Sequence, residues 1–300
     1  MRFIRKNFLL LFLLFFAVSN QAVHAADITS EGKAAMKQME DTLCSYADSM
    51  YAAFLPDMRP IYSERFVRHL VRALKTPDSW SYDFPALSKK INILYPDDKT
   101  FRIFNWEIAP ADGVRRYYGA IQLPGTELKL YGMVDHSQDI GRNAEDTILR
   151  KGVWYGCLYY RIQKTSNEGE DYYTLFGLNA SDRTSNKKVL DPLTFTDAGP
   201  VFGAPIFAVS SQNKSGSRID RFVLEFKKGV QVGMNWDTEK GCIYFDDLVS
   251  AVNDPARKYT YVPSGQMNGF RWADGQWNYM KDIITIVPRK DGQAPINEEQ

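Results

Sequence analysis

The sequence predicts an α+β fold in which two N-terminal helices precede a large antiparallel β domain. Up to about residue 75, apolar residues recur every three or four positions, as on one face of a helix. From Ile91 onward the period approaches two, and polar turns separate short apolar runs as far as the C-terminal region. Short connections favour antiparallel pairing. We therefore expect a meander of antiparallel units that is sandwich-like or resembles an incomplete propeller.

Residues 1–25 have the organisation of a signal peptide. Three basic residues precede an apolar run at 8–18, and the segment ends in Val-His-Ala, which suits cleavage. The run is shorter than the roughly 20 residues that a membrane-spanning helix needs. We expect an exported chain that begins at Ala26, is periplasmic or secreted, and keeps no stable membrane anchor.

The charge balance argues against a general affinity for nucleic acid. The chain has 37 Lys and Arg against 36 Asp and Glu, and residues 1–25 contain three of the basic residues and no acidic one. The mature chain is therefore close to neutral, with a net charge of about −2. Aromatic residues are abundant, with 17 Tyr, 18 Phe and 6 Trp, which suits strands and sugar-facing surfaces. The expected partner is an unidentified protein or envelope polymer, and not nucleic acid.

The helical region is expected over residues 26–89. An amphipathic pattern predicts a first helix over 30–54, after which Pro56 and Pro60 interrupt the pattern. A second helix is predicted over 63–75, with Ser63 as its N-cap. Its outer surface is basic and carries Arg65, Arg68, His69, Arg72 and Lys75. This surface suits a contact with anionic lipid or an envelope polymer, but a solvated face is the favoured interpretation.

The β domain is expected over residues 90–287, and the hairpin at 152–178 is predicted to be central in its sheet. Its first strand, 153–162, has apolar or aromatic residues at both parities, which indicates cover on both faces. A solvated loop at 163–171 is predicted to join it to the second strand. Further strands are predicted at 101–106, 115–123, 127–134, 172–179, 187–195, 221–226, 230–236, 242–245, 269–272 and 276–280. The stretch 199–207 is interpreted as a connection, and 288–300 as a polar tail.

Three cysteines remain after export: Cys44, Cys157 and Cys242. An oxidising compartment permits at most one intramolecular bridge among them. A β domain of this length does not need a disulfide to compensate for a thin core. We therefore predict three buried thiols, with a bridge between Cys157 and Cys242 as the alternative.

No motif in the sequence is a catalytic signature. The mature chain has two histidines, His69 and His136, which limits zinc and nucleophile systems. The segment Asp135-His136-Ser137 is not a triad, because triad members come from separate segments. Asp135, Ser137, Asp139 and Asp146 are spaced as in a calcium loop. However, Ile140 stands where such a loop needs glycine, and Asp146 where it needs glutamate, so a solvated loop is favoured. We predict no catalytic, cofactor-binding or metal-binding residue.

A glycan-directed hydrolase is the alternative to a binding protein. Such an enzyme needs two carboxyl groups about 5 to 9.5 Å apart in one cleft. The candidates in this sequence are Asp135, Asp139, Asp191 and Asp246. Asp246 and Asp247 are adjacent and would point to opposite faces of a strand, so they are interpreted as turn residues.

Several strand and turn motifs occur in a characteristic order: WYGCLYYRI, KKVLDPLTF, VFGAPIF, RFVLEF, IYFDDL and FRWADGQWNYMKDI. In these motifs the chain resembles a family of uncharacterised exported bacterial proteins, over roughly residues 91–282. The resemblance implies export and a β-rich domain and adds no activity. The expected function is that of an exported, non-catalytic binding or interaction protein of the cell envelope.

Overall fold

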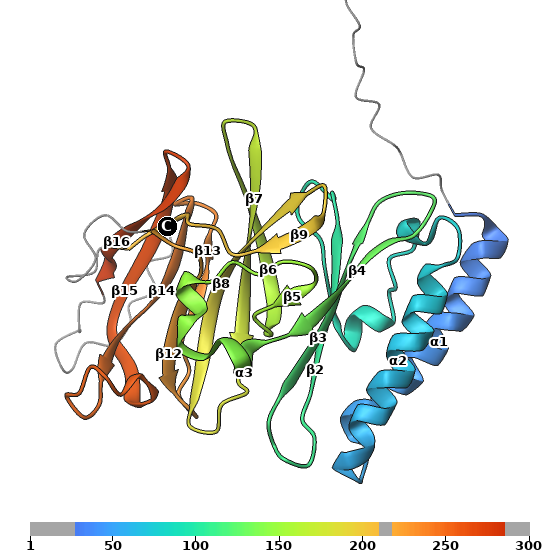
Figure 1. Cartoon of the computed structure of the whole chain (residues 1–300), viewed down its shortest axis with the longest axis horizontal. Helices are drawn as coiled ribbons and strands as arrows, with labels where there is room; N and C mark the ends of the chain where they lie inside the picture. The colour runs from blue at the N-terminus through green and yellow to red at the C-terminus, as the bar shows by residue number, and fades with distance from the viewer. Residues whose placement is uncertain (1–27, 210–217, 286–300) are drawn as a thin grey trace, which may run out of the picture.

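The computed structural model describes residues 28–209 and 218–285, which form a stack of four layers (Figure 1). A pair of helices forms the first layer, and three open β-sheets follow it in roughly the order of the chain. The predicted α+β fold, with N-terminal helices and a mostly antiparallel β region, is confirmed. The signal peptide predicted at 1–25 and the tail predicted at 288–300 lie outside the described residues.

The helical layer consists of α1 (Ser30–Ala52) and α2 (Arg59–Leu74), joined through the short 3-10 helix η1 (Pro56–Met58). Thr29 caps α1, and its hydroxyl accepts a hydrogen bond from the Gly32 N–H. The α2 helix begins at Arg59, four residues before Ser63. The prediction that Ser63 is the N-cap is therefore wrong. Pro60 lies in the first turn of α2, where a missing N–H costs nothing. Ser63 is instead buried inside the helix, where it accepts a hydrogen bond from the Trp106 indole.

The first sheet has the strand order β1 to β5, with one parallel pair between β4 and β5. Its strands are β1 (Asn92–Leu94), β2 (Arg102–Ile108), β3 (Arg116–Leu123), β4 (Lys129–Asp135) and β5 (Val153–Trp154). Alternation along β2 separates two cores: Phe104 and Trp106 pack against the helices, while Ile103 packs against the middle sheet. The 3-10 helices η2 (Ser79–Ser81) and η3 (Leu87–Lys89) connect α2 to β1.

The middle sheet has the order β12-β8-β7-β6, and β9 also pairs with β8. Its strands are β6 (Leu158–Asn167), β7 (Glu170–Asn179), β8 (Ser185–Thr196), β9 (Gly199–Phe202) and β12 (Phe222–Lys227).

The single strand predicted at 153–162 is wrong, because the chain passes from the first sheet to the middle sheet at Gly156. Gly156 has φ +32°, a conformation that side chains disfavour, and it separates β5 from β6. The solvated loop predicted at 163–171 is also wrong. Both strands continue into it, and only Glu168 and Gly169 form the turn, with φ of 51° and 87°.

The 152–178 hairpin is not central in its sheet as predicted, because β6 forms one edge and only β7 is internal. The strand β6 carries aromatic residues on both faces because it lies between two hydrophobic cores, and not because it is central in its sheet. Tyr159 packs in the core next to the first sheet, whereas Tyr160 packs in the core next to the third sheet. The hairpin is thus covered by neighbouring layers rather than by neighbouring strands.

The third sheet has the order β11-β10-β16-β15-β14-β13, with β10 and β16 parallel. Its strands are β10 (Phe207–Ala208), β11 (Arg218–Ile219), β13 (Met234–Asp237), β14 (Cys242–Ser250), β15 (Tyr261–Ala273) and β16 (Gln276–Thr285). The stretch 199–207, predicted to be a connection, contains β9 and reaches β10, so that it links two sheets. Asp246 and Asp247 are strand residues beside a register shift and not turn residues.

The three cysteines are free thiols in the structure. Cys157 and Cys242 are buried, whereas Cys44 on α1 is half-buried rather than buried as predicted. Cys157 lies in the core between the first and middle sheets, and Cys242 lies on β14 of the third sheet. The middle sheet therefore separates the two residues of the alternative bridge.

Candidate functional site

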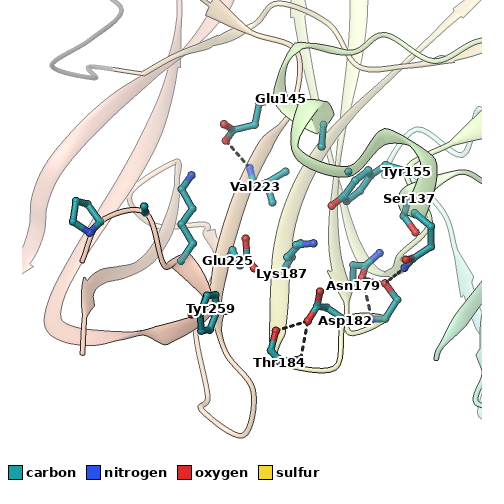
Figure 2. A pocket seen from close by; sticks show the side chains of 17 residues that line it. Ser137, Glu145, Tyr155, Asn179, Asp182, Thr184, Lys187, Val223, Glu225 and Tyr259 are labelled. Atoms are coloured by element: carbon teal, nitrogen blue, oxygen red, sulfur yellow. Dashed lines mark hydrogen bonds between the residues drawn. The ribbon is translucent and has the colours of Figure 1, made fainter. Parts of the chain in front are cut away.

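A polar cleft of about 480 Å³ opens where the middle sheet meets two short helical segments (Figure 2). One wall is the segment with α3 (Ser137–Ile140) and η4 (Gly141–Asp146), and the opposite wall is the loop that leads into η5 (Lys258–Thr260). The remaining lining comes from Tyr155, from the turn before β8, and from β8 and β12. Its volume lies within the range typical of sites for small ligands.

Two side chains that carry hydroxyl groups, Tyr155 and Ser137, are buried in the lining of this cleft. Tyr155 is 1% exposed, and the Arg221 guanidinium lies 5.3 Å from its ring centroid. Burial raises the pKa of Tyr155, so that its hydroxyl stays protonated and able to donate. The Oγ of Ser137 is buried and has no hydrogen-bond partner among the described residues. Because buried polar groups are nearly always paired, the Ser137 hydroxyl points to a partner that the ligand supplies.

Asp182 and Glu225 bring two carboxylates to the cleft, and Ser185 connects them. The Ser185 N–H donates to Asp182 Oδ1 at 3.1 Å, and its hydroxyl donates to Glu225 Oε1 at 2.6 Å. The two carboxylate oxygens are therefore at most roughly 9 Å apart, given the bond lengths within one serine. Partial burial alone would raise the pKa of Asp182, but hydrogen bonds from Thr184 and Ser185 lower it below its usual value.

Two lysines, Lys187 on β8 and Lys258 on η5, supply cationic donors to the same cleft. The ammonium group of neither lysine has a hydrogen bond or an ion pair within residues 28–209 and 218–285, although the charge of Lys187 helps to lower the pKa of Asp182. Figure 2 shows Lys187, Glu225 and Asp182 around the opening, below Tyr155. The cleft thus offers hydroxyl and ammonium donors, carboxylate acceptors and tyrosine rings, a combination that suits a ligand with many hydroxyl groups.

A second cleft of about 440 Å³ adjoins the first around the edge strand β12. The two clefts share Glu145, Val223, Glu225 and Lys258. The second cleft is more apolar, and its lining includes Phe222, Leu224, Phe245 and Tyr279. An extended ligand could therefore continue from the polar cleft along β12.

A buried ion pair holds the wall of the polar cleft in place. Arg221 and Asp191 are both fully buried, with Nε donating to Oδ1 at 2.7 Å. The Nη1 group of Arg221 donates to the carbonyl oxygens of Ala144 and Thr147, at 2.7 and 3.2 Å. Burial raises the pKa of Asp191, while the charge of Arg221 and the Tyr159 hydroxyl oppose that rise. Arg221 therefore ties η4 to the middle sheet and also lies against Tyr155.

The structure does not bring the four candidate hydrolase carboxylates into one cleft. Asp135 ends β4 and accepts hydrogen bonds from the backbone of Tyr117 and Ser137. Asp139 is exposed and pairs with His136 at 3.0 Å, and Asp191 is buried with Arg221. Asp246 accepts a hydrogen bond from the Gly233 N–H and lines the more apolar cleft. None of the four lines the polar cleft.

The other candidate polar residues are also accounted for. His69 stacks against Tyr46, with 4.8 Å between the ring centroids. The oxygen-rich segment from Asp135 to Asp146 folds into α3 and η4 instead of a solvated loop. Among the described residues, no group of three or more His, Cys, Asp or Glu side chains is arranged to hold a metal ion.

Sequence reasoning missed Tyr155, Asp182, Lys187 and Glu225 as site residues. They come from separate segments, and each is an ordinary strand or turn residue in its local sequence. The sequence of β12 carries a weak signal, because Glu225 interrupts a strand whose other residues are mostly apolar. No feature of the local sequence shows that these four residues line the same cleft.

Comparison with known proteins identifies no relative. The chain matches no family model, no curated protein and no solved structure.

Proposed function

We propose that this protein is an exported, non-catalytic binding protein of the cell envelope, and that its ligand site is the polar cleft. The carrying observation is the buried, unpartnered hydroxyl of Ser137 in a cleft that the buried Tyr155 also lines. Satisfying such groups stabilises a complex with a ligand of matching polarity. The mixture of donors, acceptors and tyrosine rings favours a hydroxylated ligand, such as a segment of an envelope glycan.

Location, anchoring and family membership belong to the same proposal. The features of residues 1–25 support export to the periplasm or the exterior, and the resemblance to uncharacterised exported proteins supports the same location. None of the helices within the described ranges has the length and hydropathy of a membrane-spanning segment. The proposed partner is a glycan or a protein of the envelope, and not nucleic acid.

A glycan array followed by calorimetry tests this proposal. We expect a sugar-bearing ligand that binds the parent protein and binds at least about tenfold more weakly to Tyr155→Phe and Ser137→Ala, because each change removes one hydroxyl. Tyr244→Phe, which removes a hydroxyl outside both clefts, is the matched control and should bind normally. Retention of no glycan, or equal binding by all four proteins, would count against the proposal.

A glycan-directed hydrolase is the second candidate, and one observation favours it. Asp182 and Glu225 line one cleft and are held close together by Ser185. However, the lowered pKa of Asp182 suits an anion and not a general acid. The test is the release of reducing ends from envelope glycans. Release that is lost in both Asp182→Asn and Glu225→Gln would support the enzyme over the binding protein.

A further inference from the structure

The connection between α1 and α2 presents a cluster of exposed apolar side chains, which we call the apolar tip. Phe54 is 96% exposed and Leu55 is 60% exposed, and Tyr51 and Ile61 are also exposed. Figure 1 shows this connection at the lower end of the helical layer, and Arg59, which follows it, donates to the Ala109 carbonyl just after the end of β2. Large apolar side chains cluster in this way on surfaces that contact a partner or a membrane.

The exposed face of α2 continues from the apolar tip as a row of cations, which we call the basic face. It consists of Arg65, Arg68, Arg72 and Lys75, all exposed and three or four residues apart. The row begins at Arg65, one turn after Ile61 of the tip, and extends for roughly 15 Å along the helix. Glu64 is the acidic residue beside it, and it pairs with Arg68. The face therefore keeps a net positive charge.

We infer that the apolar tip and the basic face form a docking surface for an anionic lipid bilayer. A helix that lies on a bilayer places cations along the headgroups and inserts apolar side chains at the boundary with the acyl chains. The tip projects instead of forming a groove, so it suits insertion into lipid better than binding of a peptide or helix. The row of cations matches an extended anionic surface. Contact of this kind is reversible and needs no spanning helix.

This inference is independent of the polar cleft, because no residue of the tip or the basic face lines it. A lipid contact would hold the protein at the membrane surface while the cleft stays open. Loss of vesicle binding and loss of glycan binding are therefore separate results.

Vesicle sedimentation tests the inference with protein recovered after export from a bacterial host, its N-terminal residue read by mass spectrometry. We expect binding to vesicles of mixed phosphatidylglycerol and phosphatidylcholine, little binding to phosphatidylcholine alone, and weakening as salt is raised. Phe54→Ser/Leu55→Ser and Arg65→Gln/Arg72→Gln should each lower the partition coefficient at least about tenfold. Circular dichroism checks that each variant is folded.

Two matched control variants test whether vesicle binding depends on this surface or on exposed apolar and cationic residues in general. Val249→Ser/Val252→Ser changes exposed apolar residues on β14 and in the turn that follows it, and Lys33→Gln/Lys37→Gln removes exposed cations from α1. Both should bind vesicles as the parent does. The inference is overturned if the parent does not sediment, or if the tip and basic-face variants bind as the controls do. It is also overturned if the tip instead forms a dimer that Phe54→Ser/Leu55→Ser dissociates.

Discussion

Arg221 donates from Nε to Oδ1 of Asp191 at 2.7 Å, and both side chains are completely buried. Removing one partner leaves the other without its countercharge, so Arg221→Met should lower the free energy of unfolding by about 3 to 5 kcal/mol. Urea titration measures this loss. The double variant Asp191→Asn/Arg221→Met removes both charges and should recover most of it; equal instability of the single and double variants would contradict the role given to the pair.

The same Arg221→Met variant should show a distinctive pH dependence. Burial raises the pKa of Asp191, and loss of the nearby cation raises it further. A raised carboxyl pKa favours the folded state below the ordinary value near 4, and this stability is lost as pH rises through the folded pKa. The loss in free energy of unfolding of the variant, relative to the parent, should therefore be smaller at about pH 4 than at about pH 7. A loss in free energy of unfolding that does not depend on pH would show that the variant loses only the packing of the Arg221 side chain.

Lys164 should govern stability in acid, because it joins two carboxylates at distances of 2.9 Å to Asp98 and 2.7 Å to Asp171. Partial burial raises the pKa of Asp98, but hydrogen bonds from Lys164 and Thr100 outweigh it, so that the pKa is lowered. The hydrogen bond from Lys164 also lowers the pKa of Asp171.

A lowered carboxyl pKa stabilises the folded state above the ordinary value, and the stability is lost as pH falls through the folded pKa. The acid unfolding midpoint of Lys164→Met should therefore shift to higher pH, as followed by circular dichroism. Lys281→Met is the control, because Lys281 is exposed and lies 4.0 Å from Asp282. Equal midpoints for the parent and Lys164→Met would refute the prediction.

The three thiols should differ in reactivity in the native protein. Burial raises the pKa of Cys157 well above its usual value, and burial also raises that of Cys242. Because the thiolate is the reactive form, both should resist iodoacetamide, while the half-buried Cys44 reacts first, although slowly. Mass spectrometry locates the label. After unfolding without reductant all three should react, and a single modified cysteine would reveal a disulfide.

Gly156 should be intolerant of a side chain. Its φ is +32°, and an added Cβ would overlap the Asp135 carboxylate. Gly156→Ala should lower the free energy of unfolding by more than the roughly 1 to 2 kcal/mol that a left-handed backbone costs. Gly113→Ala is the matched control, because Gly113 has φ +73° and no atom near the added Cβ. Calorimetric unfolding compares the two variants, and equal losses would mean that the overlap is relieved without cost.

The sequence predicts the type of most elements in this chain, and long-range packing decides what it misses. The periodicity identifies α1 and α2, but the start of α2 was misplaced because Pro60 is as acceptable within a first turn as before a helix. The aromatic run at 153–162 reads as one strand, since each of its residues favours extended backbone. Only the approach of Asp135, from a different segment, shows why Gly156 divides it.

The candidate site was less accessible to sequence reasoning than the fold. Tyr155 and Lys187 look like ordinary strand residues, and their common cleft depends on how α3, η4 and η5 lie against the middle sheet. Asp191 was selected as a carboxylate at a strand end, but the structure buries it with Arg221. A pattern of residue types cannot distinguish a carboxylate that lines a cleft from one that is enclosed in a core.

The layered architecture has a consequence for how the chain is made. The strands β14 to β16 cover the outer face of the middle sheet, where Phe176 and Leu190 pack against Phe270 and Trp277. These covering strands are synthesised after every strand of the middle sheet, so a chain that ends near residue 240 would leave that face open to water. Prematurely terminated chains should therefore aggregate or be degraded. The apolar surface that they expose to proteases would be that of the middle sheet and not that of the helices.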